Sequence, residues 1–399
     1  MVSISKDRLE RTISSLGLIG YVEGQGVDRP AYSPNYRKAR DLVEQLMIQA
    51  GMETRTDAVD NLFGYLPGSE AGGKTILLGS HLDAVPGGGI YDGALGVVAA
   101  IEAVQAIRES GTELNLGLEV VAFTAEEGGD LGGTFGSRSF VGLAADKSKP
   151  EILAQYDLTT ADIVNSRGQL DRYCAYLEFH IEQGPVLWKR QIPVGIPTAI
   201  ASITRYNVTV AGEANHAGTT PMDQRDDAMR TAAALMTEWY NFCCNQNEFV
   251  SNIGVLSISP GSPTIVPEKV EFILEIRSTE PDTTKYAVDT FQDILNSHCS
   301  GKGAMTLIID KPPVKLDSEL IETIADVCAA AKIDHLKMPS GASHDASPIS
   351  HFIPTGMIFV PSVKGISHSR AEYTPHEDIC VGTEVMVKTI LRLDQKHNS

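Results

Sequence analysis

Basic residues are scarce in this chain of 399 residues. Lysine and arginine together number 33, against 51 aspartate and glutamate residues, which gives a formal net charge of -18. A chain of this charge lacks the basic surface that holds a phosphate backbone, so we expect no nucleic-acid partner. Its 42% hydrophobic and 21% charged residues are typical of a globular enzyme and exclude a disordered or fibrous protein.

Long apolar runs, an export signal and closely paired cysteines are missing as well. The longest mostly apolar stretch, residues 94–107, contains Glu102 and Gln105 and is too short and too polar to span a bilayer. Residues 1–7 are charged and amphipathic, which does not resemble a signal peptide. None of the six cysteines belongs to a C-x-x-C motif. We therefore expect a cytoplasmic protein without membrane contact.

Strand and helix patterns alternate in the first part of the chain. Residues 75–79 form a short apolar strand pattern, residues 93–110 have helical apolar spacing, and residues 116–123 are typical of a buried strand. This order predicts an α/β fold, with a larger catalytic domain whose central mixed sheet is flanked by helices.

The pattern changes near residue 206. Strand patterns at 206–210, 270–277 and 305–309 alternate with helical patterns at about 223–244 and 287–297, which predicts two helices on one antiparallel sheet. A helix at 319–331 and a strand at 355–360 then resume the α/β character. We predict a catalytic domain formed by residues 1–206 and 314–399. An inserted α+β satellite domain, residues 207–313, would serve as a dimerisation domain or lid.

Histidines and acids follow the expected strands. His81 and Asp83 come after the first strand, and Glu126 and Glu127 come after the second. Ligands of α/β sheets bind beyond the carboxyl ends of the strands, so these residues could meet at one edge. An extended segment places His81 and Asp83 on the same side, as a metal ligand and the carboxylate that orients it would require.

Three more candidate ligands stand at comparable positions. Asp92 lies in a glycine-rich loop that matches neither G-x-G-x-x-G nor G-x-x-x-x-G-K, so a nucleotide site is disfavoured. His180 ends a strand pattern, and His368 follows the strand at 357–360. Each histidine alone is more often a core or loop residue than a ligand, and an isolated Glu-Glu pair is usually a solvated turn. Their combination favours a metal centre.

Six motifs resemble those of the M20 metallopeptidase superfamily. More narrowly, they resemble its amidase branch of N-carbamoyl-L-amino-acid hydrolases, β-ureidopropionases and allantoate amidohydrolases. The motifs are S-H-L-D at 80–83, D-G at 92–93, E-E-G at 126–128, H-I-E-Q-G-P at 180–185, N-H-A-G-T-T-P-M at 215–222 and G-I-S-H at 365–368. The likeness extends over nearly the whole chain in the right order, and the fourth and fifth strings are specific to the amidase branch.

The resemblance implies two divalent metal ions per subunit. His81, Asp92 and His180 would hold one ion, and Asp92, Glu127 and His368 the other. Two cations about 3.5–4 Å apart need a bridging carboxylate to offset their repulsion, and Asp92 is expected to supply it. Histidine and carboxylate ligands suit Zn²⁺, although Mn²⁺, Co²⁺ or Ni²⁺ could occupy such sites.

The resemblance also implies catalytic and substrate-binding roles. Glu126 is expected to be the general base, which takes a proton from a metal-bridging water and returns it to the leaving nitrogen. Asp83 would orient His81. His216 would reach across a dimer interface and stabilise the oxyanion in the partner's active site. The expected substrate-binding residues are Gln183, Thr264, His344 and Arg277, of which the last would pair with the substrate carboxylate.

Three positions depart from the family pattern. Thr264 stands where the family usually has asparagine, and a hydroxyl is shorter than an amide and offers one donor instead of two. Asp130 replaces a customary arginine after the paired acids, and Ser343 replaces a glycine in S-G-A-G-H-D-A. The expected metal ligands and base are all present, so the departures concern the substrate.

We therefore predict a homodimeric metal-dependent hydrolase of linear, non-peptide amide C–N bonds. The favoured substrate is an N-carbamoyl-L-amino acid, cleaved to amino acid, carbon dioxide and ammonia. Allantoate or N-carbamoyl-β-alanine is the second choice, and an N-acyl amino acid is the third. A catalytically idle metal-binding protein would lack the base or a ligand, and none is missing. A nucleotide-binding α/β protein is a weaker alternative, because the glycine loop does not match.

Overall fold

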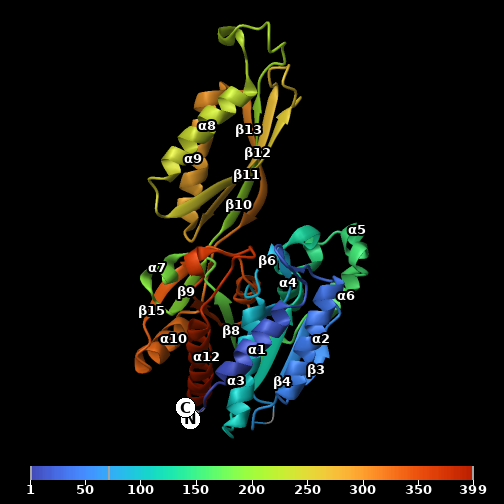
Figure 1. Ribbon diagram of the computed structural model, residues 1–399, viewed down its shortest axis with the longest axis vertical. Coiled ribbons are helices and arrows are strands. Elements are labelled where there is room, and N and C mark those ends of the chain that lie inside the picture. The colour runs from blue at the N-terminus through green and yellow to red at the C-terminus, as the bar shows by residue number, and fades with distance from the viewer. Residues whose placement is uncertain (1, 71, 398–399) are drawn as a thin grey trace. The chain divides into compact units, whose positions relative to one another are not determined.

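The computed structural model describes residues 2–70 and 72–397 (Figure 1). The chain divides into two compact units. The first comprises Met1–Thr198 and Lys315–Ser399, and the second comprises Ala199–Val314. The expected satellite-domain boundaries, 207–313, and the role of that domain in dimerisation or as a lid stay a prediction.

A mixed sheet forms the centre of the first unit. In spatial order its strands, among the residues described, are β14 (Val314–Lys315), β9 (Val194–Ile200), β16 (Thr355–Val360), β8 (Tyr173–Ile181), β5 (Thr75–His81), β7 (Gly117–Phe123), β4 (Leu62–Leu66) and β3 (Glu53–Thr56), and β15 (His335–Ser340) pairs with β9. The middle strands β16, β8, β5 and β7 run parallel, whereas β4 and β3 continue the sheet in antiparallel orientation. A smaller sheet contains β1 (Tyr21–Val22), β2 (Gly26–Arg29) and β6 (Ala84–Gly88).

The first unit also contains helices, several of which flank the large sheet. They are α1 (Lys6–Gly17), α2 (Pro34–Gln49), α3 (Ala94–Glu109), α4 (Phe135–Val141), α5 (Pro150–Leu153), α6 (Thr160–Asn165), α7 (Val186–Arg190), α10 (Ser318–Ala330), α11 (Ala346–Ile349) and α12 (His376–His397). Helix α3 packs on β5 and β8, while α10 and α12 pack on β16. Every residue of β5 and β7 is buried, as expected for parallel strands covered on both faces. The predicted α/β fold with a central mixed sheet flanked by helices is confirmed.

The second unit is an antiparallel sheet with two helices. Its strands lie in the order β11 (Phe249–Ser259), β12 (Lys269–Ser278), β10 (Ile203–Ala211) and β13 (Gly303–Lys311), and its helices are α8 (Ala228–Cys243) and α9 (Pro281–Cys299). Buried and partly exposed residues alternate along β12, so one face packs against the helices in a core centred on Trp239, Phe272 and Phe291. Helix α8 begins later than the pattern at 223 predicts, because the Asp227 carboxylate caps it by accepting two backbone N–H groups.

None of the helices within residues 2–70 and 72–397 has both the length and the apolar character needed to cross a membrane.

Candidate metal centre and active site

The predicted ligands gather at the carboxyl ends of four neighbouring strands, β7, β5, β8 and β16. Among the residues described, three groups of potential ligand atoms lie there, each with all its atoms within 4.8 Å of one another. One of them, formed by Glu178, His180 and His344, was not expected from the sequence, and the other two are the predicted ligand groups. His81, Asp92 and His180 form the first group, and Asp92, Glu127 and His368 form the second. The structure therefore brings together the five residues that the sequence singles out as metal ligands.

Asp92 lies between the three histidines. Its Oδ1 is 3.1 Å from His180 Nε2 and 3.7 Å from His81 Nε2. Its Oδ2 is 3.1 Å from His368 Nε2, which in turn lies 3.4 Å from Glu127 Oε2. Each Asp92 oxygen thus faces a different group, which is the arrangement of a carboxylate that bridges two cations.

The backbone fixes the tautomers of two of these histidines. His81 Nδ1 lies 3.1 Å from the Asp83 carbonyl oxygen, and His180 Nδ1 lies 2.9 Å from the Ile181 carbonyl oxygen. A carbonyl oxygen only accepts, so both Nδ1 atoms donate, and each ring turns its Nε2 toward Asp92, as a lone pair when the ring is neutral. A lone pair that faces a carboxylate oxygen requires a proton or a cation between them. The donor set therefore fits a metal ion.

The ionisation of the cluster also fits a cation. Burial disfavours the ionised form of Asp92, but the hydrogen bonds with His180 and His368 hold its pKa well below its usual range. Burial also opposes protonation of His180, yet the hydrogen bond to Asp92 raises its pKa to about 9. Burial and the charge of Asp92 raise the pKa of Glu127 to about 10, and its Oε1 has no hydrogen-bond partner among the described residues. Several acids in one buried place, one with an orphaned oxygen, indicate a site for positive charge.

Glu126 lies beside these groups without belonging to either. It is 8% exposed, and its Oε2 is 3.9 Å from His81 Nε2. The Asp83 carboxylate accepts hydrogen bonds from the backbone N–H groups of Glu126 and Glu127, each at 3.1 Å. The preceding Ala125 has a left-handed φ of 55°, which costs a non-glycine residue about 1–2 kcal/mol and is typical of functional turns. Asp83 therefore fixes the Glu126–Glu127 turn with its carboxylate and faces His81 with its carbonyl oxygen.

Gly93, which follows Asp92, satisfies a local steric requirement. Its φ is 62°, and a Cβ atom built on it would lie 2.3 Å from the His81 ring. A larger residue could not bring Asp92 and His81 this close together. The glycine therefore makes the first ligand group possible.

Two expected substrate contacts lie in the same region. Gln183 Nε2 donates to Asp92 Oδ2 at 2.9 Å, and the Gln183 side-chain oxygen is buried without a partner among the residues described. His344 is 1% exposed, its ring packs at 4.6 Å against that of His180, and its Nε2 lies 2.8 Å from Ser340 Oγ. Gln183 therefore contacts the second ligand group through Asp92, and the His344 ring packs against the first group through His180. Their contacts with a substrate stay predictions.

Three buried acids of the site were not expected from the sequence. Glu178 accepts from Ser80 Oγ at 2.8 Å and from the Ala346 N–H at 2.7 Å. Asp345 is fully buried and accepts from a serine hydroxyl, and Glu372 accepts from the backbone at Asp92. Glu178 stands two residues before His180, and Glu372 stands four residues after His368. Proximity to a ligand was the signal available, but it does not show which way a side chain points.

The remaining predicted residues belong to the second unit. His216 forms a β-bridge with Ile265, and the Ala217 N–H donates to the Thr264 carbonyl oxygen at 2.9 Å, so the His216 and Thr264 loops lie side by side. They adjoin the Lys269 end of β12, whereas Arg277 lies at its other end. Eight residues of strand separate these ends by roughly 26 Å. Thr264 and Arg277 of the same chain therefore cannot hold the same substrate carboxylate.

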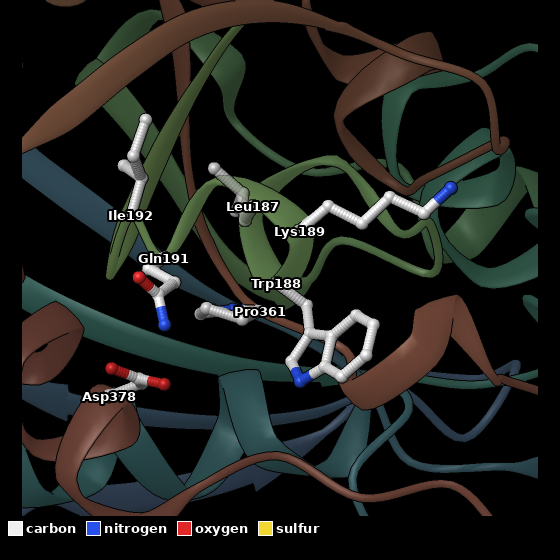
Figure 2. Close-up of a pocket in the computed structure, with 7 residues that line it drawn as sticks. All are labelled: Leu187, Trp188, Lys189, Gln191, Ile192, Pro361 and Asp378. Atoms are coloured by element: carbon white, nitrogen blue, oxygen red, sulfur yellow. The ribbon is translucent and has the colours of Figure 1, made fainter.

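A cavity of about 540 Å³ has none of the candidate metal ligands in its lining (Figure 2). Its lining comes from α7 and the turn that follows, together with one residue each after β16 and in α12: Leu187, Trp188, Lys189, Gln191, Ile192, Pro361 and Asp378. Figure 2 shows the Lys189 side chain extended away from Asp378. No expected site residue lines this cavity, so the candidate active site is defined by its ligand atoms.

Comparison with known proteins identifies the family. Residues 77–392 match Peptidase family M20/M25/M40. The chain belongs to this family. It is 36% identical to an N-carbamoyl-L-amino-acid amidohydrolase of Pseudomonas sp. (strain NS671), over 98% of this chain and 99% of that protein. It is 31% identical to an allantoate amidohydrolase of Escherichia coli (strain K12), over 98% and 99% of the two chains.

A solved structure agrees with this placement. The crystal structure of a hydantoinase/carbamoylase family amidase from Burkholderia ambifaria aligns with a TM-score of 0.87 and 31% identity, over 98% of both chains. The predicted resemblance to the amidase branch of the M20 superfamily is confirmed, and the chain is a hydrolase of that branch.

Proposed function

We propose that this protein is an N-carbamoyl-L-amino-acid amidohydrolase, which cleaves its substrate to amino acid, carbon dioxide and ammonia. The observation that carries the proposal is the pair of ligand groups that share Asp92, with Glu126 beside them. The identity of 36% to an N-carbamoyl-L-amino-acid amidohydrolase, over nearly the full length of both chains, supports this substrate class.

Two divalent ions per subunit fit the donor set. His81, Asp92 and His180 would hold one, and Asp92, Glu127 and His368 would hold the other. Among divalent ions, Zn²⁺ suits the histidine and carboxylate ligands best, and Mn²⁺, Co²⁺ and Ni²⁺ are the alternatives. When bound, the ions would supply positive charge that polarises the scissile carbonyl and lowers the pKa of a water molecule.

Glu126 would move the proton. Burial first, and then the charges of Asp345 and Glu127, raise the pKa of Glu126 well above its usual value. Cations bound in the two ligand groups would oppose this shift, which would leave the carboxylate ionised and able to take a proton from the attacking water. The resulting acid then returns the proton to the nitrogen that leaves. The bonds from Asp83 to the turn hold the base in place throughout.

His216 would stabilise the oxyanion. Its Nδ1 accepts a hydrogen bond from the Gly218 N–H at 3.1 Å, so the proton of the neutral ring lies on Nε2. The residue is exposed, and its Nε2–H would be a suitable donor to a developing negative charge. Arg277, which Glu275 holds through a contact of 2.8 Å, would bind the substrate carboxylate, and Gln183 would contact the amide.

A homodimer would unite these residues. His216 and Thr264 lie at the end of the second unit opposite to Arg277, and the chain enters and leaves that unit at the Arg277 end, through the start of β10 and the end of β13. Two copies could therefore contribute the two ends to one site. The edge strands β11 and β13 expose several apolar side chains, as surfaces that bind another protein do: Val250, Val255, Leu256, Ile258, Leu307 and Ile308.

An ammonia-release screen tests the substrate. The metal-loaded enzyme is incubated with N-carbamoyl-L-amino acids, allantoate, N-carbamoyl-β-alanine and N-acetyl amino acids, and ammonia and amino acid are measured. We expect the highest kcat/KM for an N-carbamoyl-L-amino acid. Preference for allantoate would assign the activity named for the Escherichia coli relative, and release of acetate alone would indicate an acylase. No turnover by protein that has bound metal would indicate an idle binding protein.

Substitutions at two expected substrate-binding residues, Arg277 and Thr264, should affect catalysis differently. Arg277→Lys keeps the charge but loses the bidentate fork, so KM should rise for every substrate with a carboxylate. Thr264→Asn should instead change the ratios of kcat/KM among α-carbamoyl acids, β-carbamoyl acids and allantoate by roughly tenfold, about 1.4 kcal/mol. Thr237→Asn, the same change at an exposed position of α8, is the control. Equal changes for all substrates would show that Thr264 does not select among them.

Metal binding should release protons. The pKa values of Glu127 and His180, about 10 and about 9, lie above neutral pH, so both groups hold protons in the metal-free protein. Both must lose them to become ligands, whereas the pKa of Asp92 and that of His81 are lowered and these groups have none to give. Near neutral pH we expect release of at least two protons per subunit, because the hydrogen bond to Asp92 also raises the pKa of His368, and weaker binding as the pH falls. Calorimetry in buffers of different ionisation enthalpy measures this, and binding without proton release would contradict it.

A further inference from the structure

The carboxylate of Glu372 joins the two loops that carry Asp92 and His368. Its Oε1 accepts hydrogen bonds from the backbone N–H groups of Tyr91 at 3.0 Å and Asp92 at 3.1 Å. Its Oε2 accepts from the Ser367 hydroxyl at 2.8 Å. Glu372 is 6% exposed and belongs to neither ligand group. Both of its oxygens therefore act on the segments beside the ligands, and neither acts as a ligand itself.

The Ser367 hydroxyl can serve only one acceptor at a time. It lies 2.8 Å from Glu372 Oε2 and 3.3 Å from Asp92 Oδ2. A hydroxyl has one proton, and the shorter contact indicates that Glu372 receives it. Asp92 Oδ2, the oxygen that faces His368, consequently receives no proton from Ser367, and Gln183 Nε2 is its hydrogen-bond donor at 2.9 Å.

The chain leaves space for this carboxylate at Gly89. A Cβ atom built on Gly89 would lie 2.1 Å from Glu372 Oε1 and 2.3 Å from its carboxyl carbon. The φ of Gly89 is outside the left-handed region, so the backbone itself would allow alanine there. The close approach of the Glu372 carboxylate is what requires glycine.

We propose that Glu372 is a positioning residue that holds Asp92 in register with His368 and so sets the metal affinity of the site. This inference rests on the proposed function, because it requires Asp92 and His368 to be metal ligands. A ligand whose backbone and neighbours are fixed loses less freedom on binding. Removal of such outer partners typically lowers metal affinity about 10–100-fold.

Equilibrium dialysis of the metal-free protein against Zn²⁺, with a competing chelator and elemental analysis, tests the proposal without an activity assay. The wild type should bind two Zn²⁺ per subunit. In Glu372→Ala, the affinity for at least one of them should fall about 10–100-fold. Glu372→Gln should lose less affinity than Glu372→Ala, because its side-chain oxygen still accepts from Tyr91 and Asp92, while its amide donates to Ser367 Oγ and leaves the serine proton to Asp92 Oδ2. Glu377→Ala, the same truncation at an exposed residue five positions on, should change nothing.

Gly89→Ala is an independent variant. It retains Glu372 but fills the space of its carboxylate, so it should weaken Zn²⁺ binding as Glu372→Ala does. The double variant should be no worse than either single one, since both remove the same contacts. If Glu372→Ala does not fold, as judged by circular dichroism, Gly89→Ala and Glu372→Gln decide the matter.

Two results would overturn the proposal. A wild type with two Zn²⁺ per subunit, combined with unchanged affinities in Glu372→Ala and Gly89→Ala, would refute the role of Glu372 and leave the proposed function standing. A wild type that binds no Zn²⁺, Mn²⁺, Co²⁺ or Ni²⁺ would refute the proposed function, and this inference with it.

Discussion

Glu126→Gln should leave both metal ions bound and reduce kcat by about 10²–10⁴ or more, because the variant keeps the volume of the side chain and loses only the basic oxygen. The Asp83 carboxylate binds the backbone at this position, so the turn should keep its shape. The measurements are kcat with the preferred carbamoyl acid and the metal content of the purified variant.

Glu127→Gln is the matched control for this experiment. The same substitution one residue further along should lower metal affinity, because Glu127 belongs to the second ligand group. If Glu126→Gln loses metal together with activity, Glu126 is a ligand and the assignment of the base is wrong.

Two inactive variants should restore activity when their subunits exchange. His216→Ala should lose about 10²–10³ in kcat as the oxyanion donor is removed, and Glu126→Gln lacks the base. If His216 serves the partner's site, a mixed dimer contains one site with both groups intact. Mixed dimers make up half of an equal mixture and have one intact site of two, so activity should reach about a quarter of the wild-type value.

The arrangement of the second unit is the reason for this expectation. His216 lies at one end of the second unit. Arg277 lies at the other end, and the chain enters and leaves the unit at the Arg277 end. A mixture of Glu126→Gln with His81→Ala should show no recovery, because both changes damage the site of their own chain. Proven subunit exchange without recovery in the His216 mixture would place His216 in the site of its own chain or outside catalysis.

The sequence was sufficient to predict the fold class and its strongest elements. The buried strands at 75–79 and 116–123 correspond to β5 and β7, because fully apolar runs between turn residues admit few alternatives in an α/β chain. Element boundaries were less certain. Helix α8 starts at Ala228 and not near residue 223, since the Asp227 cap decides the start and apolar spacing does not reveal it.

The candidate ligands could be found in the sequence because each follows a strand that the apolar pattern reveals. The residues that hold these ligands in place, such as Glu372, could not be found in this way. The hydrogen bonds from Tyr91 and Asp92 to Glu372 join positions 281 and 280 residues apart, and nothing in the local pattern connects them. His344 shows the same limit. Its motif indicates the site, whereas its burial against His180 depends on how α11 packs on β8 and β16.

If the ligand groups around Asp92 make this protein a metal-dependent carbamoyl hydrolase, its activity must depend on the metal bound there. Ammonia release from an N-carbamoyl-L-amino acid by chelator-treated enzyme, measured as Zn²⁺ or Mn²⁺ is added back in known equivalents, tests this dependence. We expect no release without metal and a rise that levels off at two equivalents per subunit, with one amino acid formed for each ammonia. Undiminished release by the metal-free protein, or none when two ions are bound across the carbamoyl acids tested, would contradict it.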